Sequence, residues 1–539
     1  MDRMTVDILQ APSYYPMRSG EIDGVKIWIV GTLHEYRGNP CAALYQIFTK
    51  QGDLKPIEEL LIHLRELQGN FSCIIQDQNN NVLAATDKIR SYPVFYSQRE
   101  TSLCISVDPC AIQARLPSCT RNQNAFLEFT MAGYVTLGDT LFHEIRQLQA
   151  GEFLLCDGRE SKVNEYYTFY NPGSATKTRE ELIQEVHETT KHIFKRLIER
   201  LNGRPVFVPL SGGLDSRLVL CMLKELGYDH IQAFSYGVPG NCEAAAARLI
   251  AERIGVSWFF VPYTRAFGRR TFYTPEREKY FRFAHEMTGI PMMTDFYALH
   301  YLSEQGRISK DAVIINGQTG DFISGGHIPA SCNYQDITED MVLDAIIAKH
   351  YSLWTHIQTP LNTETIKDRI RGMVGSQLTH HMSQEVTIKV YELWEWRARQ
   401  AQHVVAGQRV YDFFGLAWEL PLWDDEYLRF WSQIPFVYKF KQVLYRGYLE
   451  QYDFYGVFRM KFQRYTPPRW AHWLENAFVV FGPKREEYRR IFLQYWQKYA
   501  FFYAKDSYPT YIKYARYHRN PSSVLAQYVL QDEYQEHIP

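Results

Sequence analysis

Residues 205–227, PVFVPLSGGLDSRLVLCMLKELG, are the most restrictive stretch of the chain. An apolar, β-branched run enters a loop rich in serine and glycine, and an amphipathic helical pattern leaves it and ends at Gly227. Glycines let a backbone approach a ligand closely, and the free N–H groups at a helix start attract anions. The stretch therefore predicts a strand, an anion-binding turn and a helix, with phosphate as the expected guest.

The loop carries an aspartate where a Walker-type phosphate loop carries a lysine. Because it does not match G-x-x-x-x-G-K-S/T, the sequence argues against a γ-phosphate-transferring site of that type. Asp215 instead suggests a magnesium ligand, since Mg²⁺ is commonly held by one or two carboxylates together with phosphate oxygens. A bare S-G-G fits any glycine-rich turn of an α/β fold, whereas S-G-G-L-D-S directly after a strand is far more specific.

The remaining pattern predicts more than one domain, since 539 residues are too many for one ordinary core. Residues 1–165 contain short β-rich runs between Asn and Gly turns, as a mainly β domain would. After a helical pattern at 178–201, strands and helices alternate and predict a parallel α/β sheet. We expect strands at 205–210, 231–236, 258–263 and 312–317, and helices at 217–226 and 241–255. Residues after about 330 look mostly helical, and we expect domains at 1–165 and 175–465 with an aromatic-rich helical extension at 466–539.

Charge and cysteine content narrow the class of protein. Lys and Arg (59) balance Asp and Glu (60), so no global field favours nucleic acid or an anionic membrane. Nine scattered cysteines without a C-x-x-C pair indicate unpaired thiols in a reducing compartment and argue against zinc. The N-terminus lacks a basic stretch followed by an apolar core, and no segment reaches the roughly 18 apolar residues of a membrane span. We expect a cytoplasmic protein with no transmembrane segment and no nucleic-acid partner.

LSGGLDSRLVL resembles the pyrophosphate loop of the N-type ATP pyrophosphatases, and three later stretches resemble the asparagine synthetase family in the same order. The segment IINGQTGDFISGGH resembles the family's S-G-E-G-A-D-E-x-x-G-G, and the third stretch resembles its R-V-P-F-L-D…K-x-x-L-R-E region. The three stretches are residues 233–255, 314–327 and 419–449. The resemblance implies an N-terminal β-rich Ntn-hydrolase-like α+β sandwich followed by a doubly wound parallel-sheet ATP pyrophosphatase domain with a helical extension.

Residues 67–97 and 140–157 resemble the family's class II glutamine amidotransferase domain. That domain needs a cysteine directly after the initiator methionine, because the freed α-amino group is the base for its thiol. Residue 2 is Asp2 here, and the first cysteine is Cys41. We therefore expect an inactive scaffold domain, with ammonia supplied from solution or by a separate glutaminase, or with the attacking amine on the substrate itself.

The resemblance implies that ATP activates a carboxylate: the acid attacks the α-phosphorus, pyrophosphate leaves, and an amine then attacks the acyl-adenylate. Preorganised N–H groups, a cation and metal ions would stabilise the leaving pyrophosphate. The implied cofactors are ATP and Mg²⁺. The family's ATP- and pyrophosphate-binding positions fall on Leu210, Ser211, Gly212, Gly213, Asp215, Ser216, Tyr236, Asn316 and Gly317, and its two magnesium ligands fall on Asp215 and Asp321.

Lys441 is a catalytic candidate because it occupies the K-x-x-L slot, three residues before Leu444. The family places a lysine there against the phosphates and the tetrahedral intermediate. Both Lys439 and Lys441 also fit the ordinary role of solvated charges.

Gln318 stands where the family's segment has a glutamate, and an amide cannot take a proton from an ammonium nucleophile. Another group would have to do so. Glu392, Glu395, His327 and Glu419 are available by type, and Glu395 is favoured, although a helix-surface role fits each of these glutamates.

The leading hypothesis is an ATP-dependent amide-bond synthetase acting on a small-molecule or sugar carboxylate. Residues 316–329 and the aromatic tail resemble asparagine-synthetase-like proteins of bacterial surface-polysaccharide clusters, which are proposed to convert sugar uronic acids to uronamides. One alternative is an intramolecular lactam or macrolactam cyclase of the β-lactam synthetase or lasso peptide cyclase type. Another is a catalytically inactive nucleotide-binding scaffold, which Gln318 and Asp2 would favour. The acid, the amine source and the oligomeric state stay open, with a homodimer as one option.

Overall fold

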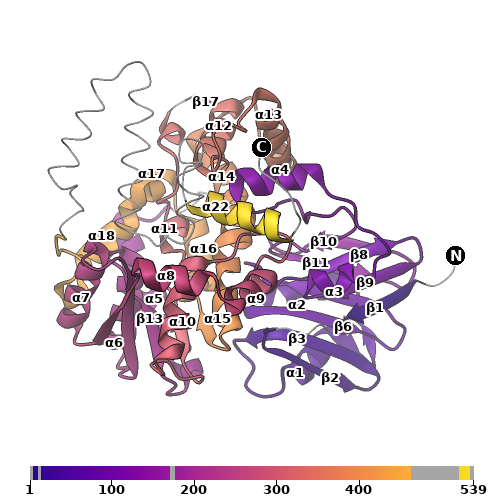
Figure 1. Cartoon of the computed structure of the whole chain (residues 1–539), viewed down its shortest axis with the longest axis horizontal. Helices are drawn as coiled ribbons and strands as arrows, with labels where there is room; N and C mark the ends of the chain where they lie inside the picture. The colour runs from indigo at the N-terminus through magenta and orange to yellow at the C-terminus, as the bar shows by residue number, and fades with distance from the viewer. Residues whose placement is uncertain (1–3, 10–13, 170–175, 335, 463–520, 534–539) are drawn as a thin grey trace.

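The N-terminal part of the chain is two β-sheets packed face to face, visible on the right of Figure 1. The computed structural model describes residues 4–9, 14–169, 176–334, 336–462 and 521–533. One sheet has the order β1 (Thr5–Leu9), β9 (Ser102–Ser106), β8 (Phe95–Arg99) and β10 (Arg146–Gln147). The other has the order β12 (Ser161–Glu165), β11 (Glu152–Cys156), β7 (Val82–Thr86), β6 (Gly69–Gln76), β3 (Val25–Leu33) and β2 (Met17–Ile22).

Each sheet buries one face against the other sheet and one face against helices. Ile74 and Val82 of the six-stranded sheet meet Leu103 and Ile105 of the four-stranded sheet in one apolar core. The opposite face of the six-stranded sheet, with Ile27 and others, packs under α1 (Pro40–Phe48) and α2 (Ile57–Glu66). On the four-stranded sheet, α3 (Pro109–Gln113) contacts β8 and β9. The predicted α+β sandwich is confirmed.

The second part is built on a five-stranded sheet in which every pairing is parallel. Its order is β15 (Ser257–Pro262), β14 (Ile231–Gly237), β13 (Val206–Pro209), β16 (Val313–Ile315) and β19 (Ala417–Glu419). The chain runs outward from β13 through β14 to β15 and then returns to β16 on the other side of β13. This reversal creates a switch point between β13 and β16, and ligands of such sheets bind there, beyond the carboxyl ends of the strands.

Helices surround this sheet, and most of the described residues after 330 are helical, as predicted. Two short antiparallel ladders, β4–β5 (Thr49–Lys50, Asp53–Leu54) and β17–β18 (Ile337–Thr338, His381–Met382), complete the strands. The helices not yet given are α4 (Gln123–Ala132), α5 (Arg179–Leu201), α6 (Leu214–Glu225), α7 (Cys242–Ile254), α8 (Arg265–Phe272), α9 (Pro275–Ala284), α10 (Met293–Glu304), α11 (Gly320–Ile323), α12 (Glu339–His350), α13 (Pro360–Val374), α14 (Gln384–Glu395), the π-helix η3 (Trp396–Val405), α15 (Arg409–Phe413), α16 (Asp425–Ser432), α17 (Phe436–Lys439), α18 (Val443–Tyr452), α22 (Pro521–Tyr528) and the π-helical turn η8 (Val529–Glu533). Most of the predicted extension at 466–539 lies outside the described residues, and α22 contacts α4.

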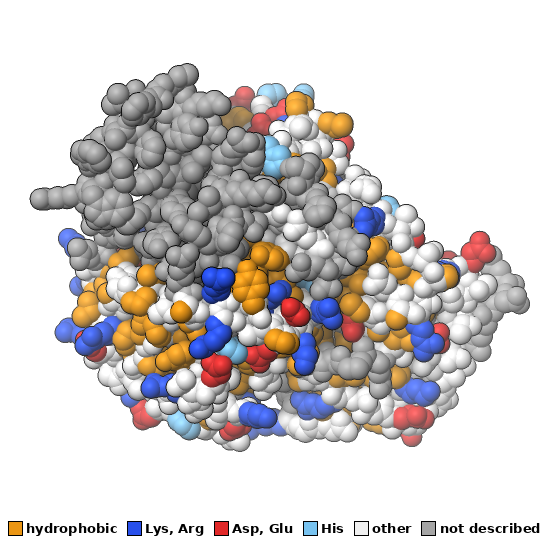
Figure 2. All heavy atoms as spheres, viewed as in Figure 1, with side chains coloured by type: hydrophobic (Ala, Val, Ile, Leu, Met, Phe, Trp, Pro, Cys, Tyr) orange, Lys and Arg blue, Asp and Glu red, His pale blue; other side chains and the backbone are white. Residues whose placement is uncertain are grey.

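The surface agrees with the balanced charge of the sequence. On the face drawn in Figure 2, basic and acidic side chains are interspersed among the coloured residues. Within the described part of the chain, no helix has both the length and the hydropathy needed to cross a membrane.

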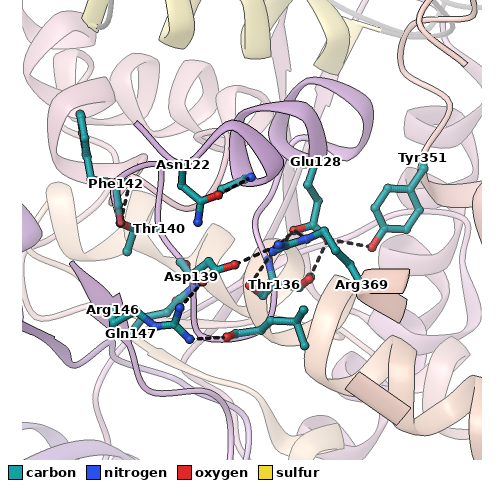
Figure 3. Close-up of polar contacts among 12 residues, drawn as sticks. Asn122, Glu128, Thr136, Asp139, Thr140, Phe142, Arg146, Gln147, Tyr351 and Arg369 are labelled. Atoms are coloured by element: carbon teal, nitrogen blue, oxygen red, sulfur yellow. Dashed lines mark hydrogen bonds and ion pairs between the residues drawn. The ribbon is translucent and has the colours of Figure 1, made fainter. Parts of the chain in front are cut away.

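A buried arginine joins the two parts of the molecule (Figure 3). Arg369 of α13 donates from Nε to Glu128 of α4 at 3.0 Å, from Nη1 to Asp139 at 2.9 Å and from Nη2 to the carbonyl of Thr136 at 3.0 Å. Tyr351 also donates to Glu128, at 3.1 Å. Burial alone would lower the pKa of Arg369, but the charges of Glu128 and Asp139 outweigh it and raise that pKa. The guanidinium therefore stays charged and fixes α13 on the β-rich part.

Replacing this arginine should cost much more stability than replacing its exposed neighbour on the same helix. We expect Arg369→Ala to lower the free energy of unfolding by about 3–5 kcal/mol, because Glu128 and Asp139 lose their buried partner. Arg371→Ala is the control: its side chain is 34% exposed, pairs with Glu339, Glu364 and Asp368 at the surface, and should cost about 0–1 kcal/mol. Denaturant titration checks both, and equal losses would refute the role given to Arg369.

Candidate functional site

The loop between β13 and α6 leads into the uncapped start of a helix at the switch point. Gly213 precedes α6 without any side-chain cap, so the start of the helix is open. Ser211 and Ser216 brace the loop: the N–H of Ser211 donates to Oγ of Ser216 at 3.1 Å, and the N–H of Gly213 donates to Oγ of Ser211 at 3.1 Å. The strand before the loop is anchored by the buried Leu210.

The N–H of Gly212 already points at an anion. It donates to the carboxylate of Glu243, at the start of α7, across 2.8 Å. The carbonyl of the same residue accepts a hydrogen bond from Arg217 at 2.6 Å. The geometry supports the prediction that this turn binds negatively charged groups, and neither Glu243 nor Arg217 was predicted to take part.

The loop after β16 packs closely on the first loop at two of its glycines. A Cβ on Gly317 would lie 2.6 Å from the N atom of Ser216, and a Cβ on Gly320 would lie 2.4 Å from Oδ1 of Asp215. This contact places the N–H of Asp321 2.9 Å from Oδ2 of Asp215. The two predicted magnesium ligands therefore lie side by side.

The two carboxylates differ in their surroundings. Burial and the charge of Asp321 raise the pKa of Asp215 to about 7, although Tyr445 donates to its Oδ1 at 2.9 Å. Desolvation alone would raise the pKa of Asp321 as well, but the hydrogen bond and charge of His327, at 2.9 Å, outweigh it and lower that pKa. Mg²⁺ in proteins is commonly held between carboxylates and phosphate oxygens, and these two carboxylates lie beside the loop that is predicted to bind phosphate. Among the described residues no cluster of three or more His, Cys, Asp or Glu ligands forms a metal site of the all-protein type.

Glu395 is connected to this carboxylate pair through one residue, His327. His327 bridges Asp321 and Glu395 through its two ring nitrogens, and Gln400 donates to Glu395 at 3.1 Å. Burial would raise the pKa of Glu395, but the hydrogen bond and charge of His327 hold it well below its usual range. For His327, burial works in the lowering direction, and the two carboxylates raise its pKa to about 9. The low pKa of Glu395 makes it a weak proton acceptor, so its catalytic role stays a prediction.

Gln318 is held in place by its neighbours. Its N–H donates to Oδ1 of Asn316 at 3.1 Å, and its side-chain oxygen accepts from Gln408 at 2.7 Å. Gln400 and Gln408 come from η3 and the turn that follows it. Sequence reasoning did not single out either residue, because nothing in that stretch signals a π-helix.

The two lysines of the K-x-x-L region have opposite environments. Lys439 is fully buried and donates to both carboxylate oxygens of Glu392, at 2.7 and 2.8 Å. Lys439 is therefore not a solvated charge, and that interpretation was wrong. Lys441 is exposed, lies 5.3 Å from the ring centre of Phe440, and has no ion-pair partner in the described part of the chain.

The turn that carries Lys441 is attached to the second loop. Gln442 donates to Oγ of Ser324 at 2.8 Å, and a Cβ on Gly325 would lie 2.3 Å from the carbonyl oxygen of Lys439. The turn of Lys441 is thereby fixed to the loop that carries Asp321.

Two of the residues predicted to line the adenosine are connected to each other, and Glu419 lies elsewhere. Tyr236 and Asn316, at the ends of β14 and β16, are joined through Asp295 and Tyr411. Glu419 pairs with Arg200 at 3.1 Å and with His34 at 3.7 Å, next to the β-rich part, which removes it as a free base. Asp2 lies outside the described residues, and Cys41 is buried at the start of α1.

The model of the asparagine synthase family matches residues 195–472, which are 278 of the 539 residues. The chain belongs to the asparagine synthase family. The model of the glutamine amidotransferase domain matches residues 61–167. The asparagine synthase match contains both loops, the carboxylate pair, Glu395 and Lys441.

Individual relatives are more distant. A probable asparagine synthetase (glutamine-hydrolysing) of Acanthamoeba polyphaga mimivirus is 26% identical over 307 residues, 53% of this chain and 49% of the relative. A 7-cyano-7-deazaguanine synthase of Polynucleobacter asymbioticus is 42% identical over 65 residues, 12% of this chain and 26% of the relative. The chain thus spans half or less of the length of these curated relatives. A solved glutamine phosphoribosylpyrophosphate amidotransferase from B. subtilis, complexed with ADP and GMP, matches 57% of this chain and 59% of that chain at 13% identity. Its TM-score of 0.20 is too low to carry an argument.

Proposed function

We propose that this member of the asparagine synthase family is an ATP-dependent carbon–nitrogen ligase that adenylates a carboxylate and converts it to an amide. The observation that carries the proposal is the pairing of Asp215 with Asp321 beside an open, amide-lined loop at the switch point. The acid oxygen attacks the α-phosphorus of ATP and the bond to pyrophosphate breaks. An amine then attacks the acyl carbon, and AMP leaves with the former acid oxygen.

The chain's residues divide this work by charge. The N–H groups around Ser211, Gly212 and Gly213 bind the pyrophosphate oxygens, and Glu243 releases Gly212 when they arrive. Asp215 and Asp321 would hold Mg²⁺, and a bound Mg²⁺ would supply charge neutralisation for the leaving pyrophosphate. We assign Lys441 to the same developing charge and Tyr236, Asn316 and Gly317 to the adenosine.

The nature of the acid and of the amine is also part of the proposal. We propose a small-molecule or sugar carboxylate, with a uronic acid of a surface polysaccharide as the first candidate, on the resemblance of residues 316–329. The amine is ammonia or an amine carried by a substrate, since the amidotransferase-like domain indicates nitrogen transfer. We propose domain limits of 1–165, 175–465 and 466–539, and a cytoplasmic location in keeping with nine cysteines that form no disulfide in the described structure.

Turnover should release AMP and pyrophosphate. The test incubates the protein with ATP, Mg²⁺, ammonium and a panel of acids that includes uronic acids, and it measures nucleotides, pyrophosphate and product mass. The expected amide is one mass unit lighter than its acid, because NH₂ replaces OH. ADP and phosphate as the only nucleotide products would overturn the proposal. An amine-bearing acid that loses one water without ammonium would identify a cyclase instead, and nucleotide binding without turnover would favour a scaffold.

Asp321→Asn should abolish most Mg²⁺-dependent turnover and leave folding intact. The side chain of Asp321 is 52% exposed, so its loss disturbs little packing, whereas a lost metal ligand removes on the order of several kcal/mol of transition-state stabilisation. Pyrophosphate release measured across a Mg²⁺ titration checks this, with Asp368→Asn on the surface of α13 as the matched control. Near-normal rates at saturating Mg²⁺ would reject the assigned site.

The two lysines should separate catalysis from stability. Lys441→Ala should lower kcat by about 10²- to 10³-fold, as is typical for the loss of one electrostatic stabiliser, with nucleotide affinity and stability nearly unchanged. Lys439→Met should instead lower the free energy of unfolding by about 3–5 kcal/mol, because Glu392 is left as a buried charge without its partner.

Both variants need pyrophosphate kinetics, calorimetric nucleotide binding and denaturant titration. A stable Lys439→Met protein, or an undiminished kcat in Lys441→Ala, would contradict the respective assignment.

A further inference from the structure

Asp295 is a buried carboxylate held by hydroxyl groups. It lies in the first turn of α10 and is 7% exposed. Its Oδ1 accepts a hydrogen bond from Tyr236, and its Oδ2 accepts one from Tyr411 at 2.9 Å. In the described part of the chain, no lysine, arginine or histidine forms an ion pair with it.

A carboxylate in such a place is costly for the fold. Burial raises the pKa of Asp295, and the hydrogen bonds from Tyr236 and Tyr411 oppose that rise. The start of α10 supplies additional favourable potential for a negative group. An apolar side chain could fill the space without the desolvation penalty, so packing alone does not account for an acid at this position.

The carboxylate of Asp295 lies at the centre of a chain of hydrogen bonds that connects the ends of β14 and β16. Tyr411, on α15, accepts from Nδ2 of Asn316 at 3.2 Å while it donates to Asp295. Asn316 in turn accepts from the N–H of Gln318 at 3.1 Å. Tyr236 lies at the end of β14 and Asn316 directly follows β16, and α10 contacts α15, beside which it is drawn in Figure 1. One acid thus fixes two side chains that belong to different strands.

We propose that Asp295 is a positioning residue that sets the affinity and base selectivity of the site for adenine nucleotides by fixing Tyr236 directly and Asn316 through Tyr411. The inference rests on the proposed function, because it takes these two residues to line the adenosine. If Tyr236 and Asn316 are already ordered, they bind a purine nucleoside without a further loss of side-chain conformational freedom. Loosening them reduces binding without changing the groups around the phosphates.

Binding of α,β-methylene-ATP, measured by calorimetry in the presence of Mg²⁺, tests the proposal without knowledge of the acid. Asp295→Asn keeps the shape but exchanges one acceptor for a donor, and we expect about tenfold weaker binding. Tyr411→Phe removes a single hydroxyl and should weaken binding in the same direction. In the double variant the two losses should not add, because both break the same link to Asn316. The ratio of affinities for the ATP and GTP analogues should fall in both single variants.

The outcomes separate this inference from the proposed function. If the unaltered protein does not bind the analogue, the proposed function fails. If it binds but Asp295→Asn and Tyr411→Phe bind equally well and select ATP equally well, the role of Asp295 is refuted. If Asp295→Asn does not fold, Tyr411→Phe alone decides, because a lost hydroxyl leaves the packing in place. Once the acid is known, a raised KM for ATP with an unchanged kcat supports positioning, and a lowered kcat alone contradicts it.

Discussion

The contact between the two loops at the switch point is the constraint on which the site depends. Gly317 allows the loop after β16 to rest on the backbone of Ser216, where a Cβ would clash, and Gly320 allows the same loop to lie against the carboxylate of Asp215. Without this close approach Asp321 would not reach Asp215. His327, which contacts Asp321, and Glu395, which contacts His327, would then no longer lie beside the carboxylate pair. The turn of Lys441 is fixed to the same loop through Ser324 and Gly325. Two small residues therefore hold together groups that come from four parts of the chain.

The parts of the fold that sequence could predict are those determined locally. The strand, loop and helix around Ser211 depend on neighbours within a few residues, and the structure has β13 and α6 where the pattern predicts them. The edge strand β19 was missed because it has three residues, which are too few to show the alternating pattern of a strand, and it ends where the motif stretch begins. The π-helix η3 was missed for a similar reason, since its sequence reads as an ordinary continuation of α14.

The role of a site residue could be predicted where the residue lies in a recognisable motif. It could not be predicted where the role depends on an ion pair between residues far apart in the sequence. Lys439 and Lys441 are two residues apart and look alike in sequence, but Glu392, 47 residues upstream, makes the first a buried ion pair. Glu395 could be singled out by type, whereas its bond to His327, 68 residues away, is what lowers its pKa. Asp295 carries no sequence signal, because an acid in the first turn of a helix is ordinary.

The distribution of charge around the switch point separates acids that are already neutralised from acids that are not. Glu392 has a buried cationic partner in Lys439, and Glu395 has a half-buried one in His327, so both acids support the structure and have little to offer a ligand. Burial and the neighbouring charge of Asp321 raise the pKa of Asp215, and a hydrogen bond from Tyr445 and the charge of His327 oppose that rise. A divalent ion bound between Asp215 and Asp321 would offset the repulsion between the two carboxylates, which supports the proposal of Mg²⁺ at this pair.

The amidotransferase-like part of the molecule has a structural role that does not depend on whether it hydrolyses glutamine. Its Glu128, Thr136 and Asp139 hold Arg369, and with it α13. α13 packs against α14, whose last residue is Glu395. The position of Glu395, and through it that of His327 beside Asp321, is thus supported from the β-rich part by a continuous series of packed helices and buried ion pairs. The candidate site is built against this domain, so the domain contributes to the fold of the site independently of any glutamine hydrolysis.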